Sequence, residues 1–316
     1  MAATTLPTPA LPAALGAEVP SVKSGSRVLR RFLRHRAAVL GMIILIGLAL
    51  FVVGGSLLLP YALAVDPAPR FKLQAPGAEH TFGTDQIGRD ILARLVYGGQ
   101  ISLLIGITAM LLSLLVGTLI GALAGYYGGL LDSILMRLTE AVLTIPRLFL
   151  LLTMSKFFGG RVPPLVIGGR EFSGSVIVII VILGITSWPG LARIVRAQIL
   201  SLRQMEYVLA AESLGVRRGR ILFRHILPNA TATIIVSATL GIASAIQSEA
   251  YISFLGLGVD SKTPTWGNML QLAPRYLGSA PWMWLFPGAL LLLTVLGVNF
   301  VGDGLRDALD PKSQKG

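Results

Sequence analysis

The 316-residue sequence contains no cysteine, which excludes disulfide bonds, thiolate catalysis and cysteine-based metal sites. Its only histidines, His35, His80 and His225, are too few and too scattered to predict a metal cluster. None of the lysines follows a glycine, so the Gly-Lys-Ser/Thr signature of a phosphate-binding loop is absent. No pairing of a nucleophile with a base stands out. We therefore expect no catalytic residue, no metal and no bound cofactor in this chain.

Charged residues are scarce as well, at 13% of the chain, whereas 53% of it is hydrophobic and the mean hydropathy is +0.74. This balance is typical of a membrane protein with several spans. The net charge of +12 could indicate nucleic-acid binding. The basic residues, however, lie between apolar runs, as they do in cytoplasmic loops of membrane proteins. We therefore expect membrane lipid, and no nucleic acid, as a partner.

The N-terminal segment has no apolar core long enough for a cleaved signal peptide. Met1–Ser26 is rich in Ala, Pro, Thr and Ser, which predicts a disordered cytoplasmic tail. The basic cluster Arg27–Arg36 precedes an apolar run and indicates the cytoplasmic side of the membrane.

Five apolar runs predict transmembrane helices, because about 20 residues suffice to cross a bilayer. They are Ala37–Leu59, Ile101–Gly125, Ser173–Ala192, Ile226–Ser248 and Tyr276–Gly302. We predict a further span at Leu130–Phe158, despite its charges, because it places the basic segment before Ile226 on the same side as the basic N-terminus. The expected fold is an all-α integral membrane protein with six spans and both termini in the cytoplasm.

The predicted organisation begins with a cytoplasmic tail (1–36), a first span (37–59) and an extracytoplasmic loop (60–98) that includes a short surface helix at Gln86–Tyr97. A core of five spans (99–303), with a cytoplasmic loop at 193–229, and a cytoplasmic tail (304–316) follow. In the extracytoplasmic loop, Asp85 and Asp90 could form a carboxylate pair, but helix capping and local ion pairing are the favoured reading.

Gly117, Gly121 and Gly125 recur every four residues in the second span. Such a face of small residues lets two helix backbones pack closely in lipid. The pattern predicts a neighbouring helix, either within this chain or in a partner subunit.

Charged and polar groups within the spans are candidates for a polar path through the membrane, because ionisable groups at membrane depth usually face a bundle interior or a wet cavity. Arg137 and Glu140 can pair on one face of the third span, which Pro146 should kink. Arg147 either faces the path or extends to an interface. Gln247 and Glu249 lie toward the outer end of the fifth span; Glu249 either faces the substrate or pairs with a cationic side chain.

The longest polar stretch beyond the N-terminal tail is Gln204–Asn229, and it predicts a helix, a turn and a second helix at the membrane surface. Met205–Leu214 contains good helix formers and neither proline nor glycine. Gly215 then suits a helix C-cap, because glycine adopts the left-handed conformation without strain. A second helix is expected over Val216–Ile226. Ala210 and Ala211 leave a small-residue face that another protein could approach.

This stretch resembles the EAA loop of binding-protein-dependent ABC transporter permeases, whose signature is E-A-A-x-x-x-G, nine residues, then I-x-L-P. Five residues stand at matching positions: Ala210, Ala211, Gly215, Leu227 and Pro228. Leu209 and His225 depart from the signature. Segments similar to the dipeptide, oligopeptide and nickel permeases are Phe82–Asp90, Phe223–Asn229, Ser253–Val259, Pro264–Leu270 and Gly302–Pro311.

The resemblance implies a type I ABC importer permease, similar to the C subunit of peptide transporters, in a bacterial inner membrane. Its expected partners are a second homologous permease, two ATPase subunits that bind ATP and Mg²⁺, and an extracytoplasmic substrate-binding protein. The EAA loop would supply a coupling helix that docks on an ATPase. By position, its expected residues are Glu206, Tyr207, Ala210, Ala211, Glu212, Leu214, Gly215 and Arg217.

Peptides are the substrate that the resemblance favours, with nickel or another small solute as the alternative. An ion-coupled secondary transporter that uses Glu140, Arg147 and Glu249 as a relay is the competing class. It leaves the spacing from Gly215 to Pro228 unexplained.

Overall fold

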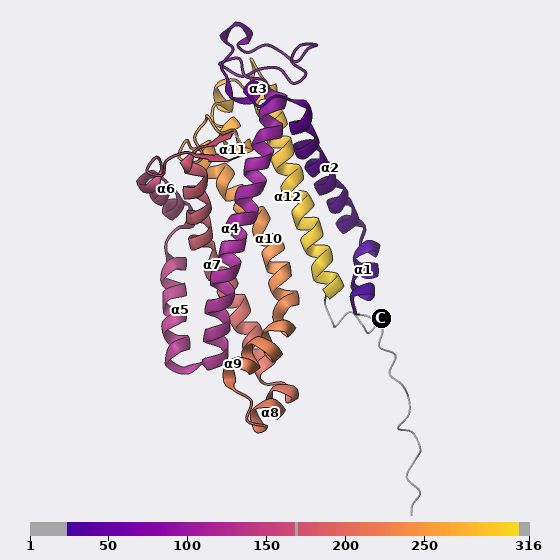
Figure 1. Ribbon diagram of the computed structural model, residues 1–316, viewed down its shortest axis with the longest axis vertical. Helices are drawn as coiled ribbons and strands as arrows, with labels where there is room; N and C mark the ends of the chain where they lie inside the picture. Colours follow the sequence, from indigo (N-terminus) through magenta and orange to yellow (C-terminus); the bar gives the residue numbers. More distant parts are fainter. Residues whose placement is uncertain (1–23, 168–169, 310–316) are drawn as a thin grey trace, which may run out of the picture.

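The computed structural model describes residues 24–167 and 170–309, which form an elongated bundle of helices (Figure 1). The predicted tail over residues 1–23 and the final residues 310–316 lie outside the described part. The long helices are α2 (Arg36–Leu58), α4 (Ile91–Tyr127), α7 (Gly174–Arg203), α10 (Leu227–Phe254) and α12 (Trp282–Leu309). The intermediate helices are α1 (Ser24–Arg34), α5 (Gly129–Thr144), α6 (Arg147–Phe158) and α8 (Glu206–Ser213).

Short elements connect these helices. They are α3 (Ala62–Val65), η1 (Pro69–Phe71), α9 (Arg218–Arg220), the π-helical turn η2 (Ile221–Ile226), α11 (Trp266–Met269) and η3 (Ala273–Arg275). One antiparallel hairpin pairs β1 (Leu165–Ile167) with β2 (Arg170–Phe172). This hairpin is a small departure from the all-α prediction.

Within the described residues, five helices are long and apolar enough to cross a membrane, and the bent pair of α5 and α6 brings the number to six. The multi-span membrane fold predicted from the sequence is therefore confirmed. In Figure 1, α8 and α9 lie at one end of the bundle, and α1 and the C-terminal end of α12 lie toward that end. α3 and α11 lie at the opposite end. Which end is cytoplasmic remains a prediction from the distribution of arginines.

The third predicted span is broken rather than kinked. α5 ends at Thr144, α6 begins at Arg147, and the two helices meet at 84°. Pro146 lacks an N–H group and excludes the helical conformation for the residue before it, so Ile145 takes an extended backbone, with φ −77° and ψ 126°. The break puts Arg147 at the first position of α6, where the chain turns sharply.

Three predicted boundaries are wrong because a glycine or a proline does not end the helix there. The expected surface helix at Gln86–Tyr97 is not separate, since its residues from Ile91 onward form the first turns of α4. Gly98 and Gly99 do not interrupt α4, because they let Thr265 and Trp266 pack against its backbone.

α7 likewise continues past Pro189 to Arg203, although its predicted end was Ala192. Transmembrane helices tolerate an internal proline where neighbouring groups satisfy the freed backbone carbonyl. α12 continues past Gly302 to Leu309, so the first residues of the predicted C-terminal tail are part of this helix. Gly302 packs against Leu240 of α10, where a side chain would collide.

The glycine face of α4 packs against α7, and its predicted role in close helix packing is confirmed for a neighbour within this chain. A Cβ atom added at Gly117, Gly121 or Gly125 would lie 2.9, 2.4 or 2.8 Å from a backbone carbonyl oxygen of α7. Beside this interface, Arg196 of α7 forms a two-point ion pair with Asp132 of α5, at 2.5 and 2.6 Å. Together these contacts place α5 and α7 around α4.

Asp85 and Asp90 act locally, as the favoured reading predicted. Asp90 caps α4 by accepting the N–H of Ala93 at 2.8 Å. Asp85 pairs with Arg89, whose Nε lies 2.7 Å from its Oδ2. The two carboxylates therefore fix the preceding loop onto the start of α4.

Candidate functional site

The first candidate site is the helix–turn–helix at residues 206–226, which joins α7 to α10 and lies at one end of the bundle (Figure 1). Gly215 ends α8, the first helix of this segment, with φ +72°. Its N–H donates to Glu212 O at 3.0 Å. The next N–H, of Val216, donates to Ala211 O at 3.1 Å. These two bonds form a Schellman motif, which requires a residue in the left-handed conformation. The predicted glycine stop is confirmed.

α8 has one buried face and one exposed face. Val208 and Ala211 are buried in a cluster with Ile221 and Leu222, which holds α8 against the start of the second helix. Ala211 therefore packs inward and is not part of the surface that the sequence predicted for docking. The remaining predicted coupling-helix residues are exposed: Glu206, Tyr207, Ala210, Glu212, Leu214, Gly215 and Arg217.

The exposed face of α8 and its C-terminal cap combine charged and apolar side chains. Leu214, at its C-terminal tip, is 83% exposed, and Leu209 and Tyr207 are also exposed. An exposed leucine beside a rigid cap is typical of a protein-binding surface when it belongs to a polar-rimmed group. The geometry thus provides a small, rigid helix that projects from the bundle and can enter a groove on another protein.

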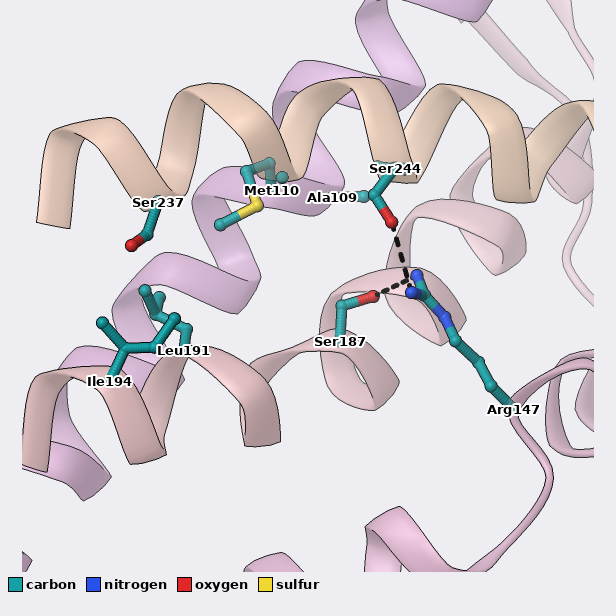
Figure 2. A pocket seen from close by; sticks show the side chains of 10 residues that line it. Ala109, Met110, Arg147, Ser187, Leu191, Ile194, Ser237 and Ser244 are labelled. Carbon is teal, nitrogen blue, oxygen red and sulfur yellow. Dashed lines mark hydrogen bonds between the residues drawn. The ribbon is translucent and has the colours of Figure 1, made fainter. Parts of the chain in front are cut away.

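The second candidate site is a pocket of about 120 Å³ between α4, α7 and α10, with Arg147 at one side (Figure 2). The guanidinium of Arg147 donates to Ser187 at 3.1 Å, to Ser244 at 3.3 Å and to Ser248 at 3.1 Å. Figure 2 shows the side chain reaching from the α5–α6 break toward serines on α7 and α10. Arg147 therefore lies beside a cavity, with its side chain exposed in this chain, and its two predicted placements stay predictions.

The other predicted path residues do not join Arg147. Glu140 is exposed on α5 and pairs with Arg137 at 3.9 Å. Gln247 is exposed on α10 and is not among the residues that line the pocket. The structure thus separates residues that the sequence grouped by charge alone.

Glu249 is fully buried and lies outside the pocket. Its carboxyl group accepts from Ser253 at 2.7 Å, from Thr265 at 2.9 Å and from Ser102 at 3.4 Å. No cationic side chain among the described residues pairs with it, so the predicted ion pair is not found. The hydroxyl groups join α4, α10 and the segment before α11, so Glu249 has a structural place in the fold.

The serines around Arg147 were missed by sequence reasoning, although a signal was present. Ser237, Gly241, Ser244 and Ser248 follow one another at spacings of four, three and four residues, which places them on one helix face. A stripe of small polar residues within an apolar span marks a face in contact with polar groups. Nothing in the sequence indicated that Arg147 would meet this stripe.

Two family models match the chain. The model described as "Binding-protein-dependent transport system inner membrane component" matches residues 117–315. The model described as "N-terminal TM domain of oligopeptide transport permease C" matches residues 25–76. Together they include every spanning helix from α2 to α12, apart from the first part of α4.

Several permease proteins are similar over nearly the full chain. The oligopeptide transport system permease protein OppC of Escherichia coli K12 is 42% identical over 90% of this chain and 90% of its own length. The dipeptide transport system permease protein DppC of Alkalihalophilus pseudofirmus is 39% identical over 92% and 91%. A putative peptide permease protein of Brucella suis is 41% identical over 95% of both chains.

A solved structure shares the fold. In inward-facing conformations of the MetNI methionine ABC transporter, one chain matches with a TM-score of 0.55 at 19% identity, over 69% of this chain and 97% of that chain. The likeness at this identity concerns the arrangement of helices alone.

Proposed function

The chain belongs to the family of binding-protein-dependent transport system inner membrane components, and from this premise we propose that it forms half of the path by which an ATP-driven importer carries peptides. As a member of this family, it is a multi-pass permease of the bacterial inner membrane. The relatives named as peptide, dipeptide and oligopeptide permeases, at 39–42% identity, favour peptides over nickel or another small solute.

The observation that carries the coupling part of the proposal is the exposed, capped helix α8. We assign α8 as the coupling helix, with Leu214 and Tyr207 entering a groove of an ATPase subunit and Glu206, Glu212 and Arg217 at the rim. Because Val208 packs against Ile221 and Leu222, movement of α8 is transmitted to η2 and α10. Each of two ATPases would bind ATP and Mg²⁺, and this chain would bind neither.

The remaining partners follow from the same premise. A second homologous permease would close the path on the side of the pocket that holds Arg147. An extracytoplasmic substrate-binding protein would deliver the peptide at the end of the bundle where α3 and α11 lie (Figure 1). The relay of an ion-coupled transporter finds no support, since Glu140, Arg147 and Glu249 lie in three separate surroundings.

Replacing Leu214 with aspartate tests α8 as the docking helix. Loss of one buried leucine costs about 2 kcal/mol, and an unpaired carboxylate in an apolar groove adds to that cost. We expect the ATPase to bind at least roughly tenfold more weakly. The measurement is the amount of ATPase recovered with the tagged permease from membranes.

Leu130→Asp is the matched control, because Leu130 is 77% exposed at the start of α5 but lies outside the helix–turn–helix. It should retain the ATPase. Equal recovery of the ATPase with both variants would show that α8 is not the docking surface.

A further inference from the structure

Arg147 is held entirely by neutral groups. Its three hydrogen-bond partners are serine hydroxyls, and no carboxylate among the described residues lies within 4.0 Å of it. Arg196 and Arg89, in contrast, pair with Asp132 and Asp85. On the predicted placement of the third span in the membrane, a cation without a counter-charge is costly, and an anion that reaches it recovers part of that cost.

The groups around Arg147 retain hydrogen-bond donors. A guanidinium has five N–H donors, and the serines accept three hydrogen bonds from it. The hydroxyl proton of Ser248 is committed to Ser244 O at 2.7 Å. Among the described residues the hydroxyls of Ser187 and Ser244 accept from Arg147 and have no acceptor of their own, so each keeps a proton for an incoming acceptor. Guanidinium and hydroxyl donors that converge suit a carboxylate, which accepts through two oxygens.

The size of the pocket limits what can enter it. Its volume of about 120 Å³ is below the roughly 300 Å³ at which pockets for whole small-molecule ligands begin. The side chains of α10 that line the pocket at Ser237, Gly241 and Ala245 are small or absent, so a peptide backbone can approach this helix closely. The pocket therefore admits one end group of a solute while the remainder stays in the path.

We infer that Arg147, Ser187 and Ser244 form a carboxylate-binding site in the translocation path, which contacts the C-terminal carboxylate of a passing peptide. The inference rests on the proposed function, because it requires the pocket to face the path. The charge-assisted contact is weak enough to release the peptide if the surrounding path is wet, since water screens the pair. The alternative source of a carboxylate for this site is an aspartate or glutamate side chain of the second permease.

The absence of native cysteine makes a labelling test direct. The assembled transporter, with Ser237→Cys in this chain, is placed in lipid nanodiscs and treated with an anionic or a cationic methanethiosulfonate reagent. The labelling rate of each reagent is divided by the rate at which the same reagent reacts with a free thiol in solution. We expect the anionic reagent to react roughly tenfold faster than the cationic one, because one unpaired positive charge lies beside the path. Arg147→Gln should remove the preference, and Arg147→Lys should keep most of it.

Protection by a substrate-like probe then tests carboxylate binding. Trialanine at millimolar concentration should slow labelling at Ser237→Cys at least about twofold, whereas trialanine amide should not, because it lacks the carboxylate. Arg147→Gln should abolish the difference between the two peptides. Ile235→Cys, two residues earlier and exposed on the opposite side of α10, is the control that should show neither charge preference nor protection.

The remaining outcomes separate the two proposals. Equal normalised labelling by both reagents, with no protection, would overturn the carboxylate site and leave the pocket as part of a wet path. Labelling at Ser237→Cys no faster than at Ile235→Cys would overturn both the site and the assignment of this pocket to the path. A preference seen in the isolated chain but lost in the assembled transporter would assign the carboxylate to the second permease and overturn the substrate site.

Discussion

Gly215→Pro is expected to abolish uptake while the permease remains inserted in the membrane. Gly215 has φ +72°, which proline cannot adopt because its ring fixes φ near −65°. The substitution also removes the N–H that Gly215 donates to Glu212 O. At a cost of about 3 kcal/mol or more, the native turn becomes roughly a hundredfold less populated, and α8 loses its fixed orientation. Uptake of a labelled peptide in cells that express the complete transporter measures the effect.

Two further glycine substitutions give this prediction its controls. Gly215→Ala should cause an intermediate loss, because a Cβ atom there meets open space and only the left-handed backbone is strained, by about 1–2 kcal/mol. Gly219→Ala, four residues later in α9 and also facing open space, should leave uptake near normal. Normal ATP-coupled uptake by Gly215→Pro would contradict the assignment of α8 as the coupling helix.

Gly121→Val should be the most damaging single change to the stability of the bundle. A Cβ atom at Gly121 would lie 2.4 Å from the carbonyl oxygen of Ala192 and 2.8 Å from Cβ of Val195. Both atoms belong to the rigid part of α7, so the helices must separate. Overpacking of this kind costs about 3 kcal/mol, and we expect the thermal midpoint in detergent to fall by roughly 6–12 °C.

Gly54→Val is the matched control for the packing of Gly121. Gly54 also lies in a spanning helix, α2, but nothing lies within 4 Å of a Cβ atom placed there. Its thermal midpoint should stay within about 2 °C of the wild type, since a surface substitution costs little. A similar loss of stability in both variants would mean that valine is unfavourable in these helices in general, and not that α4 and α7 require close approach.

The parts of the fold that were predictable from the sequence are those that depend on residues close together in the chain. Long apolar runs predicted the spanning helices, because length and hydropathy alone determine whether a helix can cross a bilayer. The glycine repeat at Gly117, Gly121 and Gly125 predicted a close helix contact, and Gly215 predicted the end of α8, since only backbone conformation was involved.

The parts that were not predictable depend on neighbours that are distant in the sequence. The predicted loop ended at Gly98, yet Thr265 packs against Gly98, Trp266 packs against Gly99, and α4 continues through both residues. The span that contains Pro189 was predicted to end at Ala192, yet Pro189 is buried within α7, which continues to Arg203. Glu249 read as a path residue because of its charge, while three hydroxyls from separate segments accommodate it in the interior.

Arg147 illustrates the same limit at the candidate site. Its sequence position after Pro146 predicted a bend but not one of 84°, and this bend determines where the side chain points. The serines of α7 and α10 then complete a polar group that no local pattern connects to Arg147 (Figure 2). The sequence predicts which residues share one face of a helix, but it does not predict which side chains of three different helices come into contact.

Purification of this protein from its native membrane in mild detergent, followed by mass spectrometry of the proteins recovered with it, tests the importer assignment most directly. We predict a homologous permease and two ATPase subunits in fixed ratio with this chain, and peptide uptake that stops when ATP is depleted. Recovery of this protein alone, repeatedly and in conditions that preserve lipid, together with uptake that continues without ATP, would contradict an ATP-driven importer.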